Sequence, residues 1–577
     1  MIKSNYFTTN EDMQYHFETL IDWEEIVNEY EDSFSHPDSN SPSSVSEAMD
    51  YYRTVIETAG DISGNYFSQA ASEIDKEGLK FKDGKVSFPK LMLETVAKGI
   101  ESGIQPYAIH RKYGGLGIPF VARAMMTELI YRGDSSMGIA FGCLNLAEIL
   151  ERIASEEMKA EWLPRLASGE FVVAMGLTEP NHGSDLQQVK TRATKQSDGT
   201  WKINGTKRFI THACGFGDTP SILLTLARTG GENSGGRGLS FFLVHGKDIQ
   251  VAGIEKKMGL HCSPTCEVVF ENTPGILIGE EGFGLVKYTM GMLNGARIGV
   301  AGQGTGMATA ALEEAKKYAN ERTQFGRKLS EIPAIQKMLA RMERETMALR
   351  AISIEGSRTV DLYYWRTEHL KAKGATEKEI RADESSRFWE KVANLFTPLC
   401  KYYCSETANK IAYDAIQIHG GSGFTEDYDI ARIYRDARIT TIYDGTTQIQ
   451  INAAIGGIAT GFGKSGVLKD YIQLEMKKFT PSERLLTLYD ILERTIATYR
   501  DLEMGALKDE FAFELAESTI RFLASMLLEK SIAKPNLTKN RELHVSDFSL
   551  DSLAIMNGNL MKLQEKTKYS NQVAMAV

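Results

Sequence analysis

Cysteine, excess positive charge and long apolar runs are all scarce in this sequence, and each shortage excludes a class of protein. Six cysteines in 577 residues are too few for a disulfide scaffold. The closest pairs, Cys262/Cys266 and Cys400/Cys404, lack histidine partners at zinc-finger spacing, which favours reduced, packed side chains over a zinc site. The 66 Lys and Arg against 76 Asp and Glu give a net charge of −10. We therefore expect no metal site and no nucleic acid partner.

Membrane-spanning and targeting signals are also missing. No apolar run approaches the ~18 residues needed to cross a bilayer, and the best candidate, residues 138–146, is interrupted by Asn145. Lys3 is the only Lys or Arg among the first fifty residues, which is the reverse of a transit peptide or signal-peptide start. The sequence predicts no membrane insertion and a cytoplasmic, unprocessed chain.

The first part of the chain has helical patterning. In residues 11–31 acids alternate with apolar side chains at helical spacing, and residues 35–46 form a polar linker. Ser44 and Glu47 have the spacing of a capping box, which predicts the start of a helix. Helices should continue to about residue 170, interrupted by a loop at residues 112–119, where glycines and a proline break the periodicity.

Strand patterning follows, and then helices return. Residues 171–278 contain short runs rich in Val, Ile, Thr and Phe. Ser197-Asp198-Gly199 and Asn204-Gly205 are typical of hairpin turns. Residues 230–238 favour a surface hairpin loop over a phosphate-binding loop, because the Lys-Ser/Thr ending of a P-loop is missing. Amphipathic helices are expected from residue 284, and Thr480-Pro481-Ser482-Glu483 predicts a capped start for a later helix.

These changes divide the chain into five predicted segments. They are an acidic helical N-terminal extension, a helical domain, a β domain, a helical bundle and an additional helical domain, over residues 1–58, 59–170, 171–278, 279–462 and 463–577. The last segment has sixteen basic and sixteen acidic residues from position 464 onward, a balance suited to packing rather than to an electrostatic binding arm.

Five motifs carry the chemical signal. Each alone has an ordinary explanation as a turn, a hairpin or a helix connection. Their order along the chain is what makes them specific, and over about residues 113–458 it resembles the acyl-CoA dehydrogenase family. The motifs are residues 177–185 (LTEPNHGSD), 204–211 (NGTKRFIT), 417–424 (QIHGGSGF), 434–438 (YRDAR) and 442–450 (IYDGTTQIQ).

The resemblance implies a fold and a reaction. The fold is α+β, with an N-terminal helical domain, a central β-barrel-like domain, a C-terminal helical bundle and an extra C-terminal helical domain, as in larger bacterial members. The reaction removes an α proton and a β hydride from an acyl-CoA thioester. The hydride goes to FAD and the electrons go on to an electron-transfer flavoprotein.

The residue that matches the family's catalytic base is Asp444, where straight-chain members most often carry Glu. The shorter side chain withdraws the carboxylate by about 1.5 Å, and misplacement on this scale can cost about 10²-fold in rate. Relatives with Asp at this position act on cyclic thioesters, and nitroalkane oxidases also use an Asp base. We therefore expect a bulky, branched or cyclic acyl group. For Asp to act near neutral pH, a dry apolar pocket must raise its pKa.

The resemblance also assigns binding residues. Arg322 should reach FAD phosphate across a subunit interface with Gln417, Gly420 and Gly421, which implies a homodimer or a dimer of dimers. The full set of expected FAD contacts is Met175, Leu177, Thr178, Gly183, Ser184, Phe209, Thr211, Arg322, Gln324, Phe325, Gln417, Gly420, Gly421, Thr446 and Gln448. The expected acyl-CoA contacts are Ser184, Asn294, Arg297, Tyr443 and Gly445.

Two alternatives remain open at this stage. One is a flavin-dependent oxidase of acyl-CoA or nitroalkane type, which would release hydrogen peroxide without an added acceptor. The other is a non-enzymatic, flavin-containing, DNA-associated relative, against which the balanced C-terminal charge argues.

Overall fold

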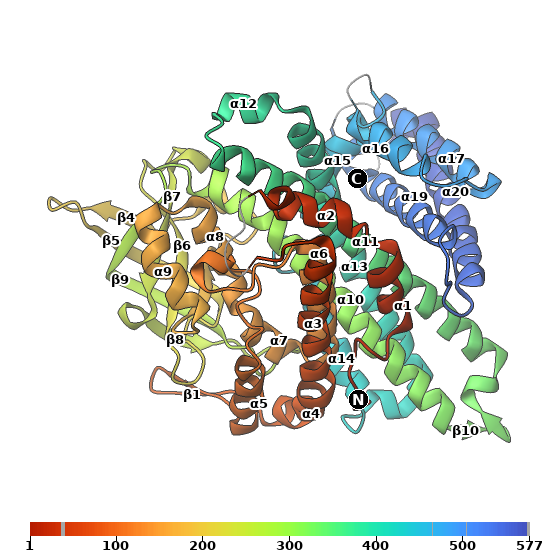
Figure 1. Cartoon of the computed structure of the whole chain (residues 1–577), viewed down its shortest axis with the longest axis horizontal. Coiled ribbons are helices and arrows are strands. Elements are labelled where there is room, and N and C mark those ends of the chain that lie inside the picture. Colours follow the sequence, from red (N-terminus) through yellow and green to blue (C-terminus); the bar gives the residue numbers. More distant parts are fainter. Residues whose placement is uncertain (36–40, 464–465, 503–504, 574–577) are drawn as a thin grey trace. The chain divides into compact units, whose positions relative to one another are not determined.

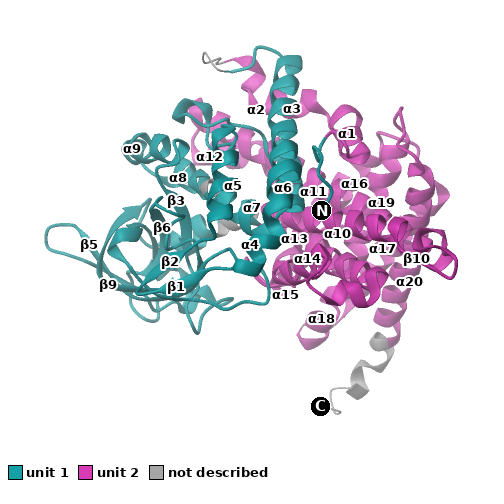
Figure 2. Ribbon diagram, turned by 90° about the horizontal axis from the view of Figure 1, so that it is seen from below, with its two compact units in different colours: residues 1–7, 37–296 teal, residues 8–36, 297–577 magenta. Residues whose placement is uncertain are grey.

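The computed structural model describes residues 1–35, 41–463, 466–502 and 505–573. The chain forms two compact units, one of residues 1–7 and 37–296 and the other of residues 8–36 and 297–577 (Figure 2). The early acidic segment thus folds with the C-terminal half of the chain rather than with the helices that follow it. Within the described residues, no helix is both long and apolar enough to cross a membrane.

The first unit begins with helices. Ser44 caps the first long helix by accepting a hydrogen bond from the Glu47 backbone N–H, as its capping pattern predicts. A small hairpin that the sequence did not signal interrupts the helices. The elements are α3 (Val45–Ile62), α4 (Ser68–Glu77), β1 (Lys80–Lys82), β2 (Lys85–Ser87), α5 (Lys90–Glu101), α6 (Phe120–Gly133), α7 (Ser135–Gly142), α8 (Glu148–Ile153) and α9 (Glu156–Ala167).

A closed sheet makes up the rest of this unit (Figure 1). The central strand, β6, is buried along its whole length and pairs with β3 in parallel and with β7 antiparallel. The ring closes because β7 pairs with β9, β9 with β5, β5 with β4, and β4 with β6. This is the barrel-like domain predicted for this region. Its strands are β3 (Val172–Gly176), β4 (Arg192–Lys195), β5 (Trp201–Thr211), β6 (Ser221–Arg228), β7 (Leu239–His245), β8 (Gln250–Ile254) and β9 (Thr265–Ile278).

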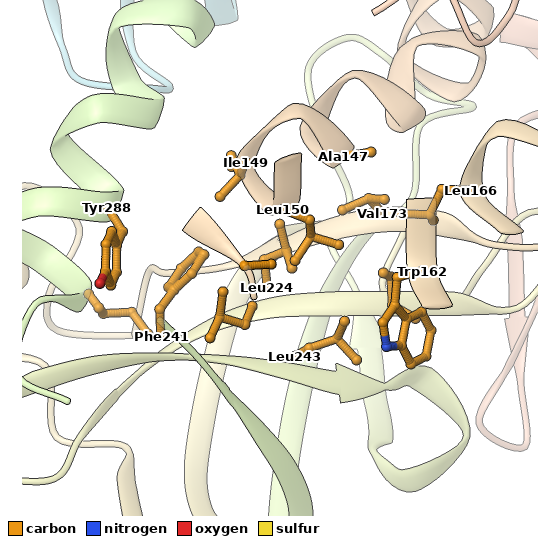
Figure 3. Packing of buried hydrophobic residues seen from close by; sticks show 14 of the residues in the cluster. Ala147, Ile149, Leu150, Trp162, Leu166, Val173, Leu224, Phe241, Leu243 and Tyr288 are labelled. Carbon is orange, nitrogen blue, oxygen red and sulfur yellow. The ribbon is translucent and has the colours of Figure 1, made fainter. Parts of the chain in front are cut away.

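An apolar core joins α8 and α9 to this sheet. Figure 3 shows Trp162 of α9 and Leu150 of α8 lying over Val173, Leu224 and Leu243 of three strands. All of these side chains are at most 2% exposed. Burying large apolar side chains against the sheet contributes about 1.5–3 kcal/mol each, so this core fixes the orientation of β3, whose end carries the first chemical motif.

The structure corrects two local predictions. Asn204-Gly205 is not a turn but lies inside β5, where a register shift and φ of 144° at Gly205 mark a bulge. A Cβ at Gly205 would lie 2.6 Å from the Thr191 hydroxyl, so glycine is needed here for close strand approach. The second correction concerns the late helix cap, which is Ser482 rather than Thr480, since Ser482 accepts from the Leu485 N–H. The Ser197–Gly199 turn between β4 and β5 is confirmed.

The second unit is helical. A very long helix begins with Pro333 at its first turn, and the N-terminal helices belong to this unit. The elements are α1 (Glu11–Tyr15), α2 (Trp23–Tyr30), β10 (Thr323–Gln324), β11 (Arg327–Lys328), α11 (Pro333–Ala372), α12 (Glu377–Ala382), α13 (Glu384–His419), α14 (Asp429–Ala437), α15 (Thr447–Thr460), α16 (Val467–Met476), α17 (Glu483–Asp501), α18 (Ala506–Glu510), α19 (Ala512–Ile532) and α20 (Arg541–Val573). Helix α10 (Met290–Glu321) runs from residues of the first unit into residues of the second.

Ion pairs attach the N-terminal segment to the later helices of this unit. Asp12 of α1 pairs with Arg350 of α11 and Arg541 of α20. Glu25 of α2 receives two hydrogen bonds from Arg358, at 2.7 and 3.1 Å. These contacts join residues more than 300 positions apart in the chain.

The cysteines are packed as expected. None of the six, all of which lie in the described residues, is in a disulfide, and Cys262, Cys266, Cys400 and Cys404 are buried.

Candidate functional site

The loop after β3 carries the first predicted flavin motif. Leu177, 8% exposed, follows the strand directly. The Thr178 side chain is half-buried and Ser184 is exposed. Two backbone hydrogen bonds of 3.1 Å between Glu179 and His182 close the loop. Of the other residues predicted here, Met175 is half-buried and Gly183 is exposed.

A buried ion pair holds this loop in place. Lys207 of β5 is fully buried, and its Nζ donates to the Leu177 carbonyl at 2.9 Å and to Glu179 Oε1 at 3.0 Å. The Glu179 carboxylate also accepts the backbone N–H groups of Lys190 and Thr191, both at 2.8 Å. Burial lowers the pKa of Lys207 to about 8, against the attraction of Glu179. Lys207 and Glu179, which belong to the first two motifs but had no predicted role of their own, therefore fix the geometry of the loop.

The first two motifs meet in this unit. The Arg208 backbone N–H donates to the Thr178 carbonyl at 2.9 Å. The next residue, Phe209, has a left-handed backbone (φ 62°) at an irregularity in β5, and its ring is 51% exposed. A left-handed aromatic residue is uncommon and marks a strained position. Thr211, half-buried, ends the strand. Hydroxyl side chains in the same unit as an exposed aromatic ring fit a flavin and its pyrophosphate.

We expect Lys207→Met to loosen this loop, which is predicted to bind flavin. The substitution removes two hydrogen bonds and leaves the buried Glu179 carboxylate without its cation. Hydrogen bonds to charged groups contribute about 1.5–3 kcal/mol each, so thermal unfolding should shift downward and the purified protein should retain less flavin. Lys247→Met, at an exposed turn, is the control. Unchanged melting and flavin content in Lys207→Met would contradict this role.

The predicted catalytic base lies in a tight turn of the second unit. Asp444 and Gly445, between α14 and α15, both have left-handed backbone, with φ of 51° and 90°. Thr446 caps α15 by accepting from the Ile449 N–H at 3.4 Å. Gln450 Nε2 donates to the carbonyls of Asp444 and Gly445, both at 2.9 Å. A Cβ at Gly445 would lie 2.6 Å from Gln450 Nε2, so this position requires glycine.

Charged groups from two helices surround Asp444. Burial raises the pKa of its carboxyl, while the nearby Lys401 and Arg297 cations oppose that rise. Arg297 is 6% exposed, and burial lowers its pKa. The Tyr443 hydroxyl donates to the Gln303 side-chain oxygen. Burial, followed by the charge of Asp444, raises the pKa of Tyr443. Asp444 is thus a half-buried carboxylate beside two cations, which favour the ionised form that a general base needs.

Other predicted cofactor residues of this unit lie on its surface. The hairpin of β10 and β11 presents Arg322 and Phe325, and the Phe325 ring is 91% exposed. Phe424, which follows the Gly420–Gly421 pair, is 89% exposed. The remaining exposed members are Gln324, Gln417, Gly420, Gly421 and Gln448. Asn294 lies outside the side chains that the structure describes.

Two side chains that hold this turn through hydrogen bonds, Lys401 and Gln450, were not predicted from the sequence. Lys401 lies within the apolar stretch of α13 from Leu395 to Tyr403. A single lysine on the buried face of a helix is the signal that could have found it. Gln450 is the last residue of the fifth motif, but the resemblance to the family assigns it no role.

Comparisons with known proteins agree with this geometry. The N-terminal, middle and C-terminal domains of acyl-CoA dehydrogenase match residues 53–170, 174–273, and 282–362 with 383–458. The 3-methylmercaptopropionyl-CoA dehydrogenase of Ruegeria pomeroyi is 34% identical over 430 residues, covering 71% of this chain and 70% of the relative.

Solved structures show the same fold. Butyryl-CoA dehydrogenase from Megasphaera elsdenii is 28% identical with a TM-score of 0.59, covering 73% of this chain and 100% of its own. An acyl-CoA dehydrogenase from Bacillus anthracis, complexed with FAD, is 22% identical with a TM-score of 0.74 and covers 98% of this chain and 92% of its own. The last similarity extends the shared fold into the terminal segments. The chain therefore belongs to the acyl-CoA dehydrogenase family and is an oxidoreductase that acts on acyl-CoA.

Proposed function

We propose that this protein catalyses FAD-dependent α,β-dehydrogenation of a bulky, branched or cyclic acyl-CoA, with Asp444 as the base. The observation that carries this proposal is the half-buried Asp444 carboxylate, held in a left-handed turn beside Lys401 and Arg297. A carboxylate in such a setting can be ionised near neutral pH and still accept a proton from carbon.

In the proposed reaction the α C–H bond breaks, its proton moves to an Asp444 carboxylate oxygen, and its electron pair forms the enolate and then the double bond. The β hydrogen leaves as hydride. When bound, FAD supplies the two-electron acceptor for that hydride. Thr178, Ser184, Phe209 and Thr211 would hold it, because none of them is fully buried and the Arg208 N–H joins the end of β5 to the loop after β3.

The length of the base supports a bulky substrate. An aspartate carboxylate lies about 1.5 Å further back than a glutamate carboxylate, which leaves room for a substituent on the α carbon. Gln450 and Lys401 fix the backbone of this turn, so a shift of the turn toward a straight chain would break hydrogen bonds. The competing expectation is a straight-chain substrate, because two relatives are named for the unbranched thioesters butyryl-CoA and 3-methylmercaptopropionyl-CoA.

An anaerobic titration tests the proposal. The flavin-containing protein is titrated with butyryl-CoA, 3-methylmercaptopropionyl-CoA, isobutyryl-CoA and cyclohexanecarbonyl-CoA while the loss of flavin absorbance is followed. We expect isobutyryl or cyclohexanecarbonyl thioesters to reduce the flavin fastest. Faster reduction by the two straight chains would overturn the substrate proposal and keep the dehydrogenation. Absence of reduction by every thioester would overturn the proposed function.

We propose that an electron-transfer flavoprotein reoxidises the enzyme. Turnover should then depend on added electron-transfer flavoprotein and release little hydrogen peroxide. Rapid peroxide formation in air without any added acceptor would instead support an oxidase.

We also propose a homodimer or a dimer of dimers. The support is the exposure of Phe325 and Phe424, at 91% and 89%, in two segments that also present Arg322 and Gln417. Large exposed aromatic side chains are typical of protein interfaces. Light scattering coupled to gel filtration should therefore give a multiple of 64.1 kDa, and a monomer that retains flavin would contradict the proposal.

A further inference from the structure

A buried lysine contacts the backbone of the catalytic turn. Lys401 of α13 is fully buried, and its Nζ donates to the Gly445 carbonyl at 2.5 Å. Gln450 donates to the same carbonyl at 2.9 Å. Two side chains from different helices therefore converge on the carbonyl of the residue that directly follows Asp444.

The geometry of the turn explains why such support is needed. Asp444 has φ of 51° and Gly445 has φ of 90°, so two consecutive residues are left-handed. For a residue with a side chain this conformation is unfavourable and persists only when its surroundings enforce it. The direction of the Asp444 side chain thus depends on the hydrogen bonds made by Lys401 and Gln450.

The charges around the turn give Lys401 a second effect. The cations that face Asp444 are Lys401 from α13 and Arg297 from α10. Glu406, also on α13, attracts Lys401 and accepts the Thr447 hydroxyl at 2.5 Å. Tyr443 faces Asp444 and Asp436 of α14. Arg297 and Lys401 repel each other, so placing the Lys401 cation beside Arg297 is electrostatically unfavourable. Filling this space with a packed side chain would not require a charge.

Burial of the ammonium group is unfavourable in itself. It lowers the pKa of Lys401 to about 8, although Asp444 and Glu406 draw it upward. An apolar side chain of similar length would fill the same space without this penalty. Residues that reduce stability and support function are common at active sites.

We propose that Lys401 is a positioning residue for the base: it holds the Gly445 carbonyl so that the Asp444 carboxylate points correctly, and its positive charge keeps that carboxylate ionised. The proposal rests on the function proposed above. Lys401 itself neither gains nor loses a proton in the reaction.

Two substitutions separate the two effects. Lys401→Met removes both the hydrogen bond and the charge, whereas Lys401→Gln retains an N–H donor without the charge. Lys410→Met, exposed on the same helix, is the matched control. The measurements are the melting temperature, flavin content, kcat, KM and the pH dependence of kcat/KM with the best thioester from the titration.

We expect Lys401→Met to lower kcat about 10- to 100-fold, because misplacement of a base by about 1 Å has effects of this size. KM should change less than threefold, and the melting temperature should be at or above that of the wild type. Loss of the cation raises the pKa of Asp444, so the acidic limb of kcat/KM should move to higher pH. Lys401→Gln should recover part of kcat but keep the displaced limb.

A second readout isolates proton removal. In a 3-thia acyl-CoA, sulfur replaces the β carbon, so the α proton can be removed but no β hydride exists. Exchange of its α protons with D2O, followed by NMR, should slow in Lys401→Met by the same factor as kcat and should be unchanged in Lys410→Met.

The outcomes are distinguishable. If Lys401→Met retains kcat and the position of the acidic limb, the proposal is overturned. It is equally overturned if activity falls together with the melting temperature and flavin content while the limb stays in place, since that pattern describes a structural residue. If Lys401→Met does not fold, the pH dependence of kcat/KM in Lys401→Gln tests the proposal. An acidic limb at the wild-type pH in that variant would overturn it. If the wild type neither exchanges the α protons nor reduces its flavin with any thioester, the proposed function fails instead.

Discussion

Asp444→Asn should retain flavin and lose acyl-CoA-dependent flavin reduction by about 10³-fold, since positioned bases contribute typically 10²- to 10⁴-fold. Asparagine is isosteric with aspartate and tolerates the left-handed backbone (φ 51°) at this position. The turn, its hydrogen bonds from Gln450 and Lys401, and the cap at Thr446 should therefore persist. Only the proton acceptor is removed.

The measurement is the anaerobic rate of flavin bleaching under saturating thioester, with melting temperature and flavin content recorded in parallel. Asp490→Asn, which removes an exposed carboxylate on α17, is the control and should keep the wild-type rate. If the Asp444→Asn variant bleaches at the wild-type rate, Asp444 has no part in the mechanism.

The pH dependence of the wild type has a defined sign. Burial raises the pKa of Asp444 above its ordinary value, and the base acts only when it is ionised. Activity should therefore be full above that raised pKa and fall as the pH decreases through it. In Asp444→Asn this limb should be missing from the residual rate, which a stopped-flow pH series would show.

The order of the motifs was enough to predict the family fold, and it assigns Asp444 as the base, which stays a prediction. The central β domain follows from the Val-, Ile- and Phe-rich strands, and Asp444 from its place in the last motif. Local signals worked where the interaction is local, as at the Ser44 cap. They were wrong at Asn204-Gly205, because pairing of β5 with β9 and close contact with Thr191 override the turn preference of the dipeptide.

The residues that support the site could not be predicted, because their roles depend on contacts across the fold. Lys207 reaches Glu179 from 28 positions away, and Lys401 reaches Gly445 from 44 positions away. The same holds for the N-terminal extension. Its acids alternate with apolar side chains at helical spacing, yet Asp12 and Glu25 form ion pairs with buried arginines, which no pattern of the segment itself reveals.

Arg358→Met should strongly destabilise the second unit. The Arg358 guanidinium contacts Glu25, Glu355 at 2.7 Å and Glu475 at 3.4 Å. Glu475 keeps Lys478 and Lys530 in the variant, and Glu355 keeps only the Tyr471 hydroxyl among the partners described. The main cost is therefore the buried Glu355 carboxylate, and removing one member of a buried pair costs about 3–5 kcal/mol.

The loss should appear as a lower melting temperature, by roughly 5–10 °C, whereas Arg381→Met, whose pair with Glu377 is 81% and 71% exposed, should melt like the wild type. The deficit should also depend on pH. In the wild type, the cations around Glu475 overcome its burial and hold its pKa at about 2, so its ion pairs stabilise the fold above the ordinary carboxyl pKa and are lost as the pH falls toward 2. The contact between Arg358 and Glu475 therefore contributes at neutral pH and is lost together with the other ion pairs of Glu475. The difference in melting temperature should be largest near neutral pH and shrink as the pH falls below the ordinary carboxyl pKa toward 2. A difference that stays constant with pH would mean that Arg358 stabilises the helices by packing alone, and not by holding the N-terminal segment through charge.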